Sequence, residues 1–434
     1  MTQLNYESNN PYSRFRQIAW VLYDFANSGF GMIGMGVVFS SYFITTLAPS
    51  NMIDGKEVRG VMVGATMISA DGVFALLTAM AALLIVLTAP VLGAIADVKG
   101  WSRPLFIIHA TLGTLVAMSM GLLQDGQWQL GAAMYVVSSF FFGIAWTFYN
   151  AFLPLLAHPS RQGRLSGFGF GAGYIGGALA VIVGVFLVQP YVGIRGVLFF
   201  GGVWWLLFSL PAFFMMPDNA PDTRPRLAKS LVGEGFKRIA RTFANIRQYG
   251  MLFLFLCAFL IFANGTDTVI NVAPAWTTAV FKTTTEQTTM IFLIVQFVAM
   301  PGAILCGYLS DKIGNKPVIV GTLAVWCVLS AVTPWLPGVA MFTVVACGLG
   351  LVLGGVQSSS RALMAKLAPA EIRNEAFGFF SLSGKAVSIF GPLAYTVVTT
   401  EYGSRWGVMA VLPFLLVGLI VMLFVKEPSA RSVA

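Results

Sequence analysis

Long apolar runs separated by short polar breaks make up most of this chain. Clear examples, almost without charged side chains, are Leu105–Leu123, Trp204–Met216, Met251–Ala263 and Val408–Val425. A helix needs about 20 residues to cross the hydrocarbon core of a bilayer, and many of the runs reach that length. The pattern therefore predicts a protein built from membrane-spanning helices.

The breaks between the runs divide the chain into twelve predicted helices. They cover 18–47, 72–96, 104–123, 131–157, 164–188, 193–216, 250–280, 287–310, 316–335, 339–367, 374–399 and 404–425. The longest polar interval separates six helices from six. We predict an all-α polytopic membrane protein with an N-terminal six-helix bundle (1–216), an amphipathic linker (217–249) and a C-terminal six-helix bundle (250–434).

The composition agrees with a membrane protein. Of 434 residues, 57% are hydrophobic and only 10% are charged, whereas soluble domains carry about 25% charged residues. Asp24 interrupts the first apolar stretch, so we expect a retained helix there and not a cleaved signal peptide. The cysteines stand singly in apolar runs, which predicts buried thiols without a metal or disulfide role: Cys257, Cys306, Cys327 and Cys347.

The positions of the basic residues predict the orientation. If the N-terminus is cytoplasmic, most lysines and arginines fall in cytoplasmic segments. The opposite side then holds only Lys56, Arg59, Arg195, Lys282 and Arg405. Cytoplasmic loops of membrane proteins carry such an excess, so we predict a multi-pass protein of the cell (inner) membrane with both termini cytoplasmic. This asymmetry accounts for the net charge of +9 without a nucleic-acid partner.

The linker combines seven basic side chains with apolar residues at helical spacing. The apolar positions are Leu227, Leu231, Phe236, Ile239, Phe243 and Ile246. A basic amphipathic helix is typical of a segment that lies on the membrane surface. We expect it to tether the two bundles on the cytoplasmic side.

The two halves of the chain repeat one another. The sequence Gly-Ala-Ile-Ala-Asp97-Val-Lys-Gly joins the second and third predicted helices, and Gly-Tyr-Leu-Ser-Asp311-Lys-Ile-Gly joins the eighth and ninth. Phe25-Ala-Asn27 in the first helix is matched by Phe262-Ala-Asn264 in the seventh. Two repeated six-helix halves are the architecture of transporters that rock about a central site.

The repeated loops also suggest how such a protein closes. Glycine lets helix ends approach closely, and an aspartate at a cytoplasmic helix end can pair with a neighbouring helix N-terminus or a basic side chain. The predicted gating residues are Asp97, Lys99, Arg103, Asp311, Lys312 and Lys316. The pair resembles the signature loop of the major facilitator superfamily. The first copy departs from that pattern at Val98 and Trp101, so we expect it to form the weaker contact.

Four further segments carry a closer resemblance. They are Tyr23–Phe30, Phe148–Pro154, Ser166–Gly177 and Phe377–Leu393. Together they are similar to the autophagy-related vacuole effluxer-like branch of the superfamily, and the likeness covers nearly the whole chain. The resemblance implies a transporter; fungal members of that branch are associated with amino-acid efflux from the vacuole.

Polar side chains within the spans are the candidates for binding or coupling. A charged side chain at the middle of a membrane helix costs about 3 kcal/mol, so such residues are candidates for function. Helical spacing places Asp24 beside Asn27, and Asp267 between Asn264 and Asn271 on the equivalent helix of the second half. We predict that these two polar stripes face a cavity between the halves and, with Lys385, bind the solute or couple its movement to protons. Because Asp24 lies near the cytoplasmic end, a structural cap is the alternative for it; for Lys385 the alternatives are a pair with an aspartate and snorkelling.

Other residues have simpler interpretations. Arg361 lies near the inner end of its helix, where snorkelling is expected, and His109 is typical of a hydrogen-bonded core histidine. Gly171–Gly176 matches the dinucleotide-binding fingerprint, but no strand precedes it and it lies inside an apolar run. Overlapping small-residue pairs there instead predict close packing of another helix.

These observations favour a secondary transporter of a small polar solute. The chain has no phosphate-binding loop for ATP, and its two histidines are too far apart to suggest a membrane enzyme. Duplicated halves in one chain favour alternating access over a static pore. The expected partners are the solute, membrane lipid and protons, with no cofactor, and we expect a monomer. The alternative is an exporter or flippase of amphipathic compounds.

Overall fold

The structure, a computed structural model, describes residues 13–53, 56–64, 66–218, 230–385 and 390–428. Ten helical stretches in these ranges are long and apolar enough to cross a membrane. One of them, Pro159–Met215, contains a kink at Gly193 (φ 68°) and turns back there, so it supplies two crossings. Two shorter helices, Arg373–Lys385 and Phe390–Tyr402, lie on either side of residues 386–389 and correspond to the predicted span 374–399. The arrangement fits the predicted twelve spans and the all-α class.

The first half contains eight of the α-helices in the described ranges. They are α2 (Arg14–Phe30), α3 (Val37–Tyr42), α4 (Ala70–Lys99), α5 (Ser102–Ser119), α6 (Trp128–Ala151), α7 (Leu153–Leu156), α8 (Gln162–Ile182) and α9 (Gln189–Met215). Short π-helical segments at Gly31–Gly36 and Phe43–Leu47 continue α2 through α3, and another at Val183–Val188 joins α8 to α9.

The second half follows a separate linker helix, α10 (Leu231–Ala244). Its α-helices are α11 (Gly250–Phe281), α12 (Thr285–Ile313), α13 (Asn315–Val332), α14 (Val339–Leu367), α15 (Arg373–Lys385), α16 (Phe390–Tyr402) and α17 (Leu412–Phe424). A 3-10 segment, Ser404–Val411, leads into α17.

Local sequence explains where several helices begin and end. The Ser69 hydroxyl accepts a hydrogen bond from the Gly72 N–H at the start of α4, and Thr284 forms a capping box with Gln287 at the start of α12. Gly100 ends α4 with φ 69°, and Gly314, with φ 99°, joins α12 to α13. The glycines of the two repeated loops thus adopt a left-handed backbone that other residues rarely allow.

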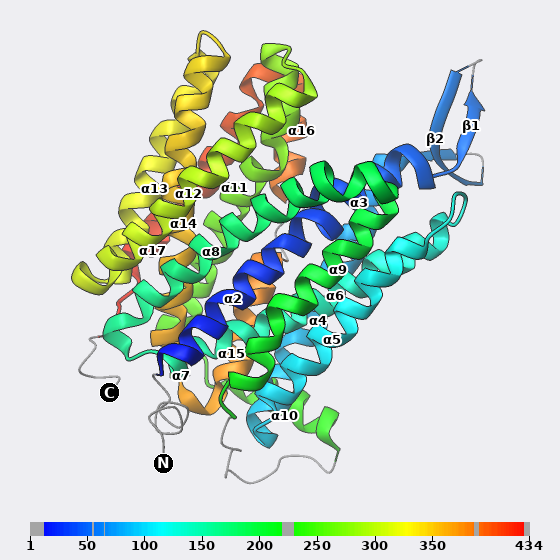
Figure 1. Ribbon diagram of the computed structural model, residues 1–434. Helices are drawn as coiled ribbons and strands as arrows, with labels where there is room; N and C mark the ends of the chain where they lie inside the picture. Colours follow the sequence, from blue (N-terminus) through cyan, green and yellow to red (C-terminus); the bar gives the residue numbers. More distant parts are fainter. Residues whose placement is uncertain (1–12, 54–55, 65, 219–229, 386–389, 429–434) are drawn as a thin grey trace.

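Between the first two predicted helices the structure has a small sheet. Strands β1 (Ser50–Ile53), β2 (Lys56–Val63) and β3 (Thr66–Ser69) pair antiparallel in the order β1-β2-β3. Asn51 helps to join β1 to β2, because its side chain donates a hydrogen bond to the Gly60 carbonyl. The sheet projects from one end of the first half (Figure 1).

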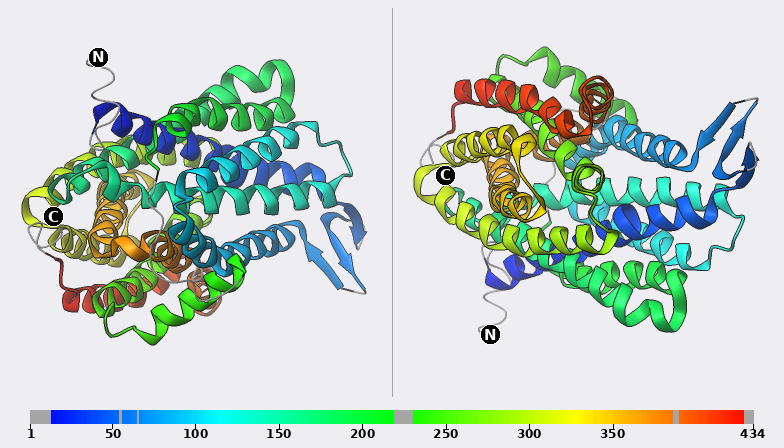
Figure 2. Two further views of the ribbon diagram at one scale, coloured as in Figure 1. Left: turned by 90° about the horizontal axis from the view of Figure 1, so that it is seen from below. Right: turned by 90° about the horizontal axis from the view of Figure 1, so that it is seen from above.

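The halves meet at one end of the molecule. We call the end that carries the start of α2 and the end of α17 the terminal side, and the end that carries the sheet the far side (Figure 1). Across the halves, α8 contacts α12 and α14, while α4 and α6 contact α15. Seen from either end, the two halves lie beside one another (Figure 2), and toward the far side their helices diverge.

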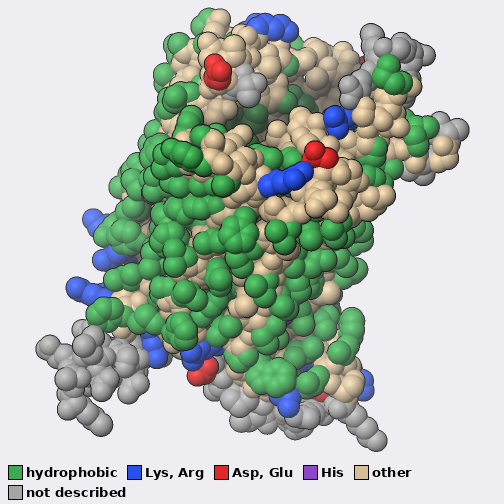
Figure 3. Space-filling model, turned by 45° about the vertical axis from the view of Figure 1, so that its right-hand side comes forward, with side chains coloured by type: hydrophobic (Ala, Val, Ile, Leu, Met, Phe, Trp, Pro, Cys, Tyr) green, Lys and Arg blue, Asp and Glu red, His purple; other side chains and the backbone are tan. Residues whose placement is uncertain are grey.

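The outer surface matches a membrane environment. Hydrophobic side chains form a broad belt around the middle of the molecule, and lysines and arginines gather toward the terminal side (Figure 3). Most large exposed side chains on the long helices are apolar, among them Leu87, Leu115, Phe214 and Val328. The chain is an integral multi-pass membrane protein.

The linker contains the predicted amphipathic helix, with one difference. Phe236 and Phe243 on α10 are exposed, as a helix at a membrane surface requires. However, α10 also packs on α4, and Glu234 and Arg238 form a buried ion pair with an N–O distance of 2.8 Å. The first part of the predicted linker, 219–229, lies outside the described residues.

Candidate functional site

Asp311, from the repeated loop of the second half, caps a helix of the first half. Its Oδ1 accepts a hydrogen bond from the Gly163 N–H (3.0 Å), and its Oδ2 accepts from the N–H (3.3 Å) and Nε (3.3 Å) of Arg164. Gly163 and Arg164 lie in the first turn of α8, where backbone N–H groups have no intrahelical acceptor. A carboxylate is stabilised there by both the hydrogen bonds and the helix dipole.

Asp97 makes the symmetry-related contact in the opposite direction. It accepts hydrogen bonds from the N–H of Asn374 (3.1 Å), the N–H of Glu375 (3.0 Å) and the Asn374 side chain (2.6 Å), all at the start of α15. We call the contacts of Asp97 and Asp311 the latches. Asp97 is buried and fully hydrogen-bonded, so its contacts give no support to the weaker first latch that we predicted.

The basic residues of the two loops act within each half instead of between halves. Arg103 donates to the carbonyls of Phe213 and Phe214, and Lys316 donates to the carbonyl of Leu423. Each residue therefore ties its loop to the last helix of its own half. Of the remaining candidates, Lys99 lies 5.7 Å from the Trp101 ring centroid, and Lys312 is exposed.

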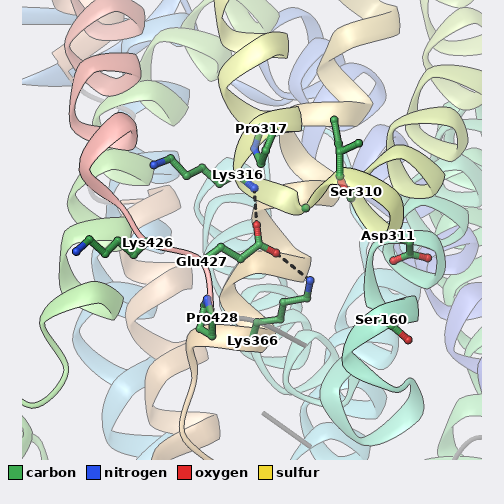
Figure 4. Close-up of a pocket in the computed structure, with 11 residues that line it drawn as sticks. Ser160, Ser310, Asp311, Lys316, Pro317, Lys366, Lys426, Glu427 and Pro428 are labelled. Atoms are coloured by element: carbon green, nitrogen blue, oxygen red, sulfur yellow. Dashed lines mark hydrogen bonds and ion pairs between the residues drawn. The ribbon is translucent and has the colours of Figure 1, made fainter. Parts of the chain in front are cut away.

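A third carboxylate, that of Glu427, joins helices of the second half to one another on the terminal side (Figure 4). It accepts hydrogen bonds from the Lys316 N–H, the Asn315 side chain and the Lys366 Nζ, each at 2.8 Å. Burial raises its pKa, but these donors outweigh that effect and hold the pKa of Glu427 below its ordinary value. These contacts join the segment after α17 to α13 and α14. The counterpart in the first half, Asp218, is exposed and reaches Arg103 at 3.5 Å.

Glycines allow the helices of the two halves to touch on the terminal side. A Cβ atom on Gly167 of α8 would lie 2.5 Å from the Ala303 carbonyl oxygen of α12. On the other flank, a Cβ on Gly378 of α15 would lie 2.8 Å from the Ala89 carbonyl oxygen of α4. The prediction that the glycines of α8 permit close helix packing is confirmed.

A buried ion pair lies between the two latches. Arg361 of α14 donates from Nη1 to Asp24 Oδ2 of α2 (2.9 Å), with the two side chains 1% and 3% exposed. It also donates to Asn150 Oδ1 (3.2 Å), Ser166 Oγ (2.9 Å) and the Ser166 carbonyl (2.9 Å). The prediction that Arg361 snorkels toward the surface is wrong, because the first half offers it a complete set of acceptors.

Aromatic rings enclose this guanidinium. Its carbon lies 4.1 Å from the Phe170 ring centroid, 4.6 Å from that of Trp20 and 5.6 Å from that of Tyr149. Arginine over aromatic faces gains cation–π attraction, most strongly where water is excluded. We call Arg361, Asp24, Asn150 and Ser166, with these rings, the arginine cluster.

Two neutral hydrogen bonds also cross between the halves. Tyr174 of α8 donates to Gln357 Oε1 of α14 (2.7 Å), and Thr147 of α6 donates to Ser381 of α15 (2.7 Å). Gln357 lies one helical turn from Arg361, on the far-side flank of the arginine cluster. Tyr174 lies within electrostatic reach of Asp24, Arg361 and Asp267.

The predicted polar stripes are only partly brought together. Asn27 is buried, and its Oδ1 has no hydrogen-bond partner among the described residues. Asn264 is also buried, but it accepts a hydrogen bond from the Gly391 N–H (3.0 Å) and so caps the start of α16 within its own half. Asn271 is exposed. The structure therefore does not gather the three asparagines around one cavity.

Asp267 is half-buried on α11, near Tyr174. Lys385 is the last residue of α15, and its side chain lies outside the described part of the structure.

His109 is buried and hydrogen-bonded to the Leu105 carbonyl (2.7 Å), as predicted. The prediction that the thiols are buried holds for Cys306, but Cys257 is exposed and Cys327 and Cys347 are only partly buried. In the described ranges no three His, Cys, Asp or Glu side chains are placed to hold a metal ion.

Sequence reasoning missed most of the arginine cluster. Asn150 and Ser166 fell within segments that carried the family resemblance, yet nothing in their spacing indicated a shared partner. Tyr174 and Gln357 are neutral residues in apolar helices and gave no separate signal. The available clue was an arginine within an apolar helix, because a charged side chain at membrane depth is energetically costly without hydrogen-bonding partners.

Comparison of the sequence with known proteins shows which family the chain resembles. Residues 13–434 match the family model described as vacuole effluxer Atg22 like. The chain is 26% identical over 427 residues to YxiO, an uncharacterized MFS-type transporter of Bacillus subtilis (strain 168), with 96% of each chain covered. It is 22% identical over 433 residues to autophagy-related protein 22-1 of Penicillium rubens, with 78% of this chain and 73% of that protein covered.

The fold also has a counterpart among solved structures. The proton:xylose symporter XylE, of the major facilitator superfamily, superposes with a TM-score of 0.73 and 15% identity over 97% of this chain and 98% of that one. Identity this low shows a shared fold and nothing about the solute. With the family match over nearly its whole length, the chain belongs to the vacuole effluxer Atg22-like branch of the major facilitator superfamily, and it is a transporter and not an enzyme.

Proposed function

We propose that this protein is a secondary active transporter that moves a small polar solute by alternating access, driven by an ion gradient with protons as the coupling ion. The observation that carries the proposal is one contact made twice, in symmetry-related places. Asp97 and Asp311 each cap a helix of the opposite half, at the start of α15 and of α8. Contacts of this kind hold one side closed and can be remade after the halves rock apart.

The groups between the halves support a polar solute. Tyr174, Gln357, Thr147 and Ser381 offer hydroxyl and amide groups, and Asp267 adds a carboxylate nearby. Such groups suit a hydrogen-bonding solute better than an apolar one. Amino acids are the first class to test, because the resemblance to vacuolar effluxers points to them.

The distribution of basic residues supports an orientation in the cell membrane with both termini cytoplasmic. In that orientation the terminal side is the cytoplasmic side. The latches and the arginine cluster then close the cytoplasmic side, and the protein has the arrangement of an outward-facing carrier.

The coupling part of the proposal rests on the carboxylates at membrane depth. Asp24 is bound to Arg361, whereas Asp267 is half-buried and near the polar groups between the halves. A carboxylate in such a place can gain and lose a proton as the surrounding water changes. We therefore assign proton coupling to Asp267.

Transport by the purified protein tests the proposal. In proteoliposomes, labelled amino acids and other small polar metabolites should accumulate when a pH gradient is imposed, and less so without one. Uptake that is the same with and without the pH gradient would contradict the proposed proton coupling. Movement of amphipathic dyes alone, with no polar solute carried, would favour the exporter or flippase alternative.

A further inference from the structure

All residues of the arginine cluster except Arg361 come from the first half of the chain. Arg361 belongs to the second half, while its hydrogen-bond acceptors Asp24, Asn150 and Ser166 all belong to the first half. The three rings around the guanidinium also come from the first half. The second half thus inserts one charged side chain into a socket formed by α2, α6 and α8.

We infer that Arg361 is the central lock of the terminal side, and that withdrawal of its guanidinium from this socket is the step that opens that side. The inference rests on the alternating-access function proposed above. It adds a positioning residue to the latches, which lie at the two flanks of the interface.

The chemistry of the pair explains why it can serve two states. A buried ion pair must be well hydrogen-bonded to offset the loss of hydration, and here Nε, Nη1 and Nη2 each have an acceptor. When the halves separate, both charges regain water. The hydrogen bonds of the closed state and the hydration of the open state therefore offset one another, and the free-energy difference between the two states is modest.

The backbone of the first half is shaped for this insertion. Gly169 of α8 lies against the ion pair, and a Cβ atom there would be 2.6 Å from both Arg361 Nη2 and Asp24 Oδ2. Only a glycine leaves room for the two charged groups to meet at this level of α8. The neighbouring Ser166 receives two hydrogen bonds from Arg361 and donates one to the Ser358 carbonyl (2.8 Å), which also crosses between the halves.

The remaining cross-half contacts have a different character. The Tyr174–Gln357 and Thr147–Ser381 hydrogen bonds are neutral, and each contributes about 1 kcal/mol or less in net terms. The latches use carboxylates against helix ends. Asp311 also pairs with Arg164 of the opposite half at 3.3 Å, but the Arg164 side chain is 40% exposed. In the Arg361–Asp24 pair both side chains are almost fully buried, so both charges must regain water when the described interface opens.

Distances between spin labels test the lock without any transport assay. The native cysteines are replaced by alanine, and label pairs are introduced by Arg161→Cys with Ile313→Cys on the terminal side, and by Gln129→Cys with Ala340→Cys on the far side. All four positions are exposed. Double electron–electron resonance then reports the populations of the two states in detergent micelles or nanodiscs, with no solute present.

Arg361→Gln should lengthen the terminal-side distance and shorten the far-side distance, because Asp24 is left as an unpaired buried charge. We expect the ratio of closed to open populations on the terminal side to fall about tenfold or more. Asp24→Asn combined with Arg361→Gln should shift the populations less than Arg361→Gln alone, since no unpaired charge remains. Arg361→Lys keeps the charge but loses the planar fork, so it should give an intermediate shift.

Arg195→Gln is the matched control. Arg195 pairs with Asp125 at 2.7 Å, but both residues belong to the first half on the far side, so the populations should not change. Unchanged distances in folded Arg361→Gln, or in Arg361→Lys if the former does not fold, would overturn the lock. A shift without transport of any solute would retain the lock and count against the proposed function.

Discussion

Two carboxylates on equivalent helices of the two halves have different surroundings. Asp24 is held in the arginine cluster, and Asp267 is half-buried near Tyr174. Each charged group at membrane depth costs about 3 kcal/mol unless the protein provides for it. This difference is the basis on which we propose that Asp24 closes the terminal side and that Asp267 couples transport to protons.

Replacement of Asp267 tests that assignment. Asp267→Asn keeps the size of the side chain and removes its titration, so accumulation driven by a pH gradient should fall tenfold or more while exchange of solute is partly retained. Asp71→Asn, which changes an exposed carboxylate in the first turn of α4, is the control and should transport normally. Full pH-driven accumulation by folded Asp267→Asn would rule out coupling through this residue.

Single residues also show where sequence reasoning stops. Asp24, Asp97 and Asp311 were identifiable because a carboxylate in or beside an apolar run is costly and needs a reason. The partner of Asp24 was not, because Arg361 lies 337 positions away and an arginine near a helix end can equally well snorkel. Pairing between halves depends on how the bundles meet, and that information is not contained in helical spacing.

At the scale of elements, helices were predictable and the small sheet was not. The predicted span 339–367 coincides with α14 (Val339–Leu367), because apolar composition and polar breaks determine where a membrane helix can run. Strands β1 to β3 are short and mix charged and apolar residues, so they carry no clear alternation. Their order depends on pairing with one another, which no single segment reveals.

The contact of α8 with α12 depends on the absence of side chains at its glycines. Gly167→Ala would place a methyl group 2.5 Å from the Ala303 carbonyl oxygen, so the terminal side should close poorly and solute uptake should fall about tenfold. Gly321→Ala on α13 is the control, since a Cβ there meets nothing within 4 Å. Normal uptake by Gly167→Ala at equal expression would show that this close approach is not needed.

The segment after α17 should stabilise the second half in a pH-dependent way. The pKa of Glu427 is lowered in the folded protein, so its contribution is present above its ordinary value of about 4.3 and is lost as pH falls through the lower folded value. Glu427→Gln should lower the free energy of unfolding by about 1–2 kcal/mol at pH 7, and the difference from wild type should shrink as pH falls from 5 to 3.

Thermal unfolding in detergent across that pH range measures this effect. Asp218→Asn is the matched control, because Asp218 holds the equivalent position in the first half but is largely exposed. It should change stability little at any pH. A constant difference between wild type and Glu427→Gln from pH 7 to pH 3 would contradict the assigned role of Glu427.

At the scale of the whole molecule, the repeat in the sequence becomes a repeat in contacts. The Asp97 and Asp311 latches are related by the same pseudo-symmetry as the loops that contain them, and Arg103 and Lys316 occupy matching positions within the halves. The arginine cluster breaks this symmetry, since its charged partners come from α2 and α14. Both kinds of contact lie toward the terminal side, which explains why the halves meet there.

The orientation of the molecule in the membrane can be tested separately. Reporter fusions after Ala220 and at the C-terminus should both give cytoplasmic signals, because the basic residues concentrate on that side. A fusion within the far-side loop, after Gly126, should give the opposite signal. An external signal from either of the first two fusions would reverse the assignment of sides.

Counterflow is the measurement that tests alternating access most directly. Proteoliposomes loaded with unlabelled amino acids are diluted into a trace of the same amino acids in labelled form, with no pH gradient. A carrier that exposes one side at a time should concentrate the label transiently inside, and Gly167→Ala should suppress the overshoot. Label that only equilibrates, with no overshoot, while the same proteoliposomes conduct the solute, would indicate a pore and contradict the account.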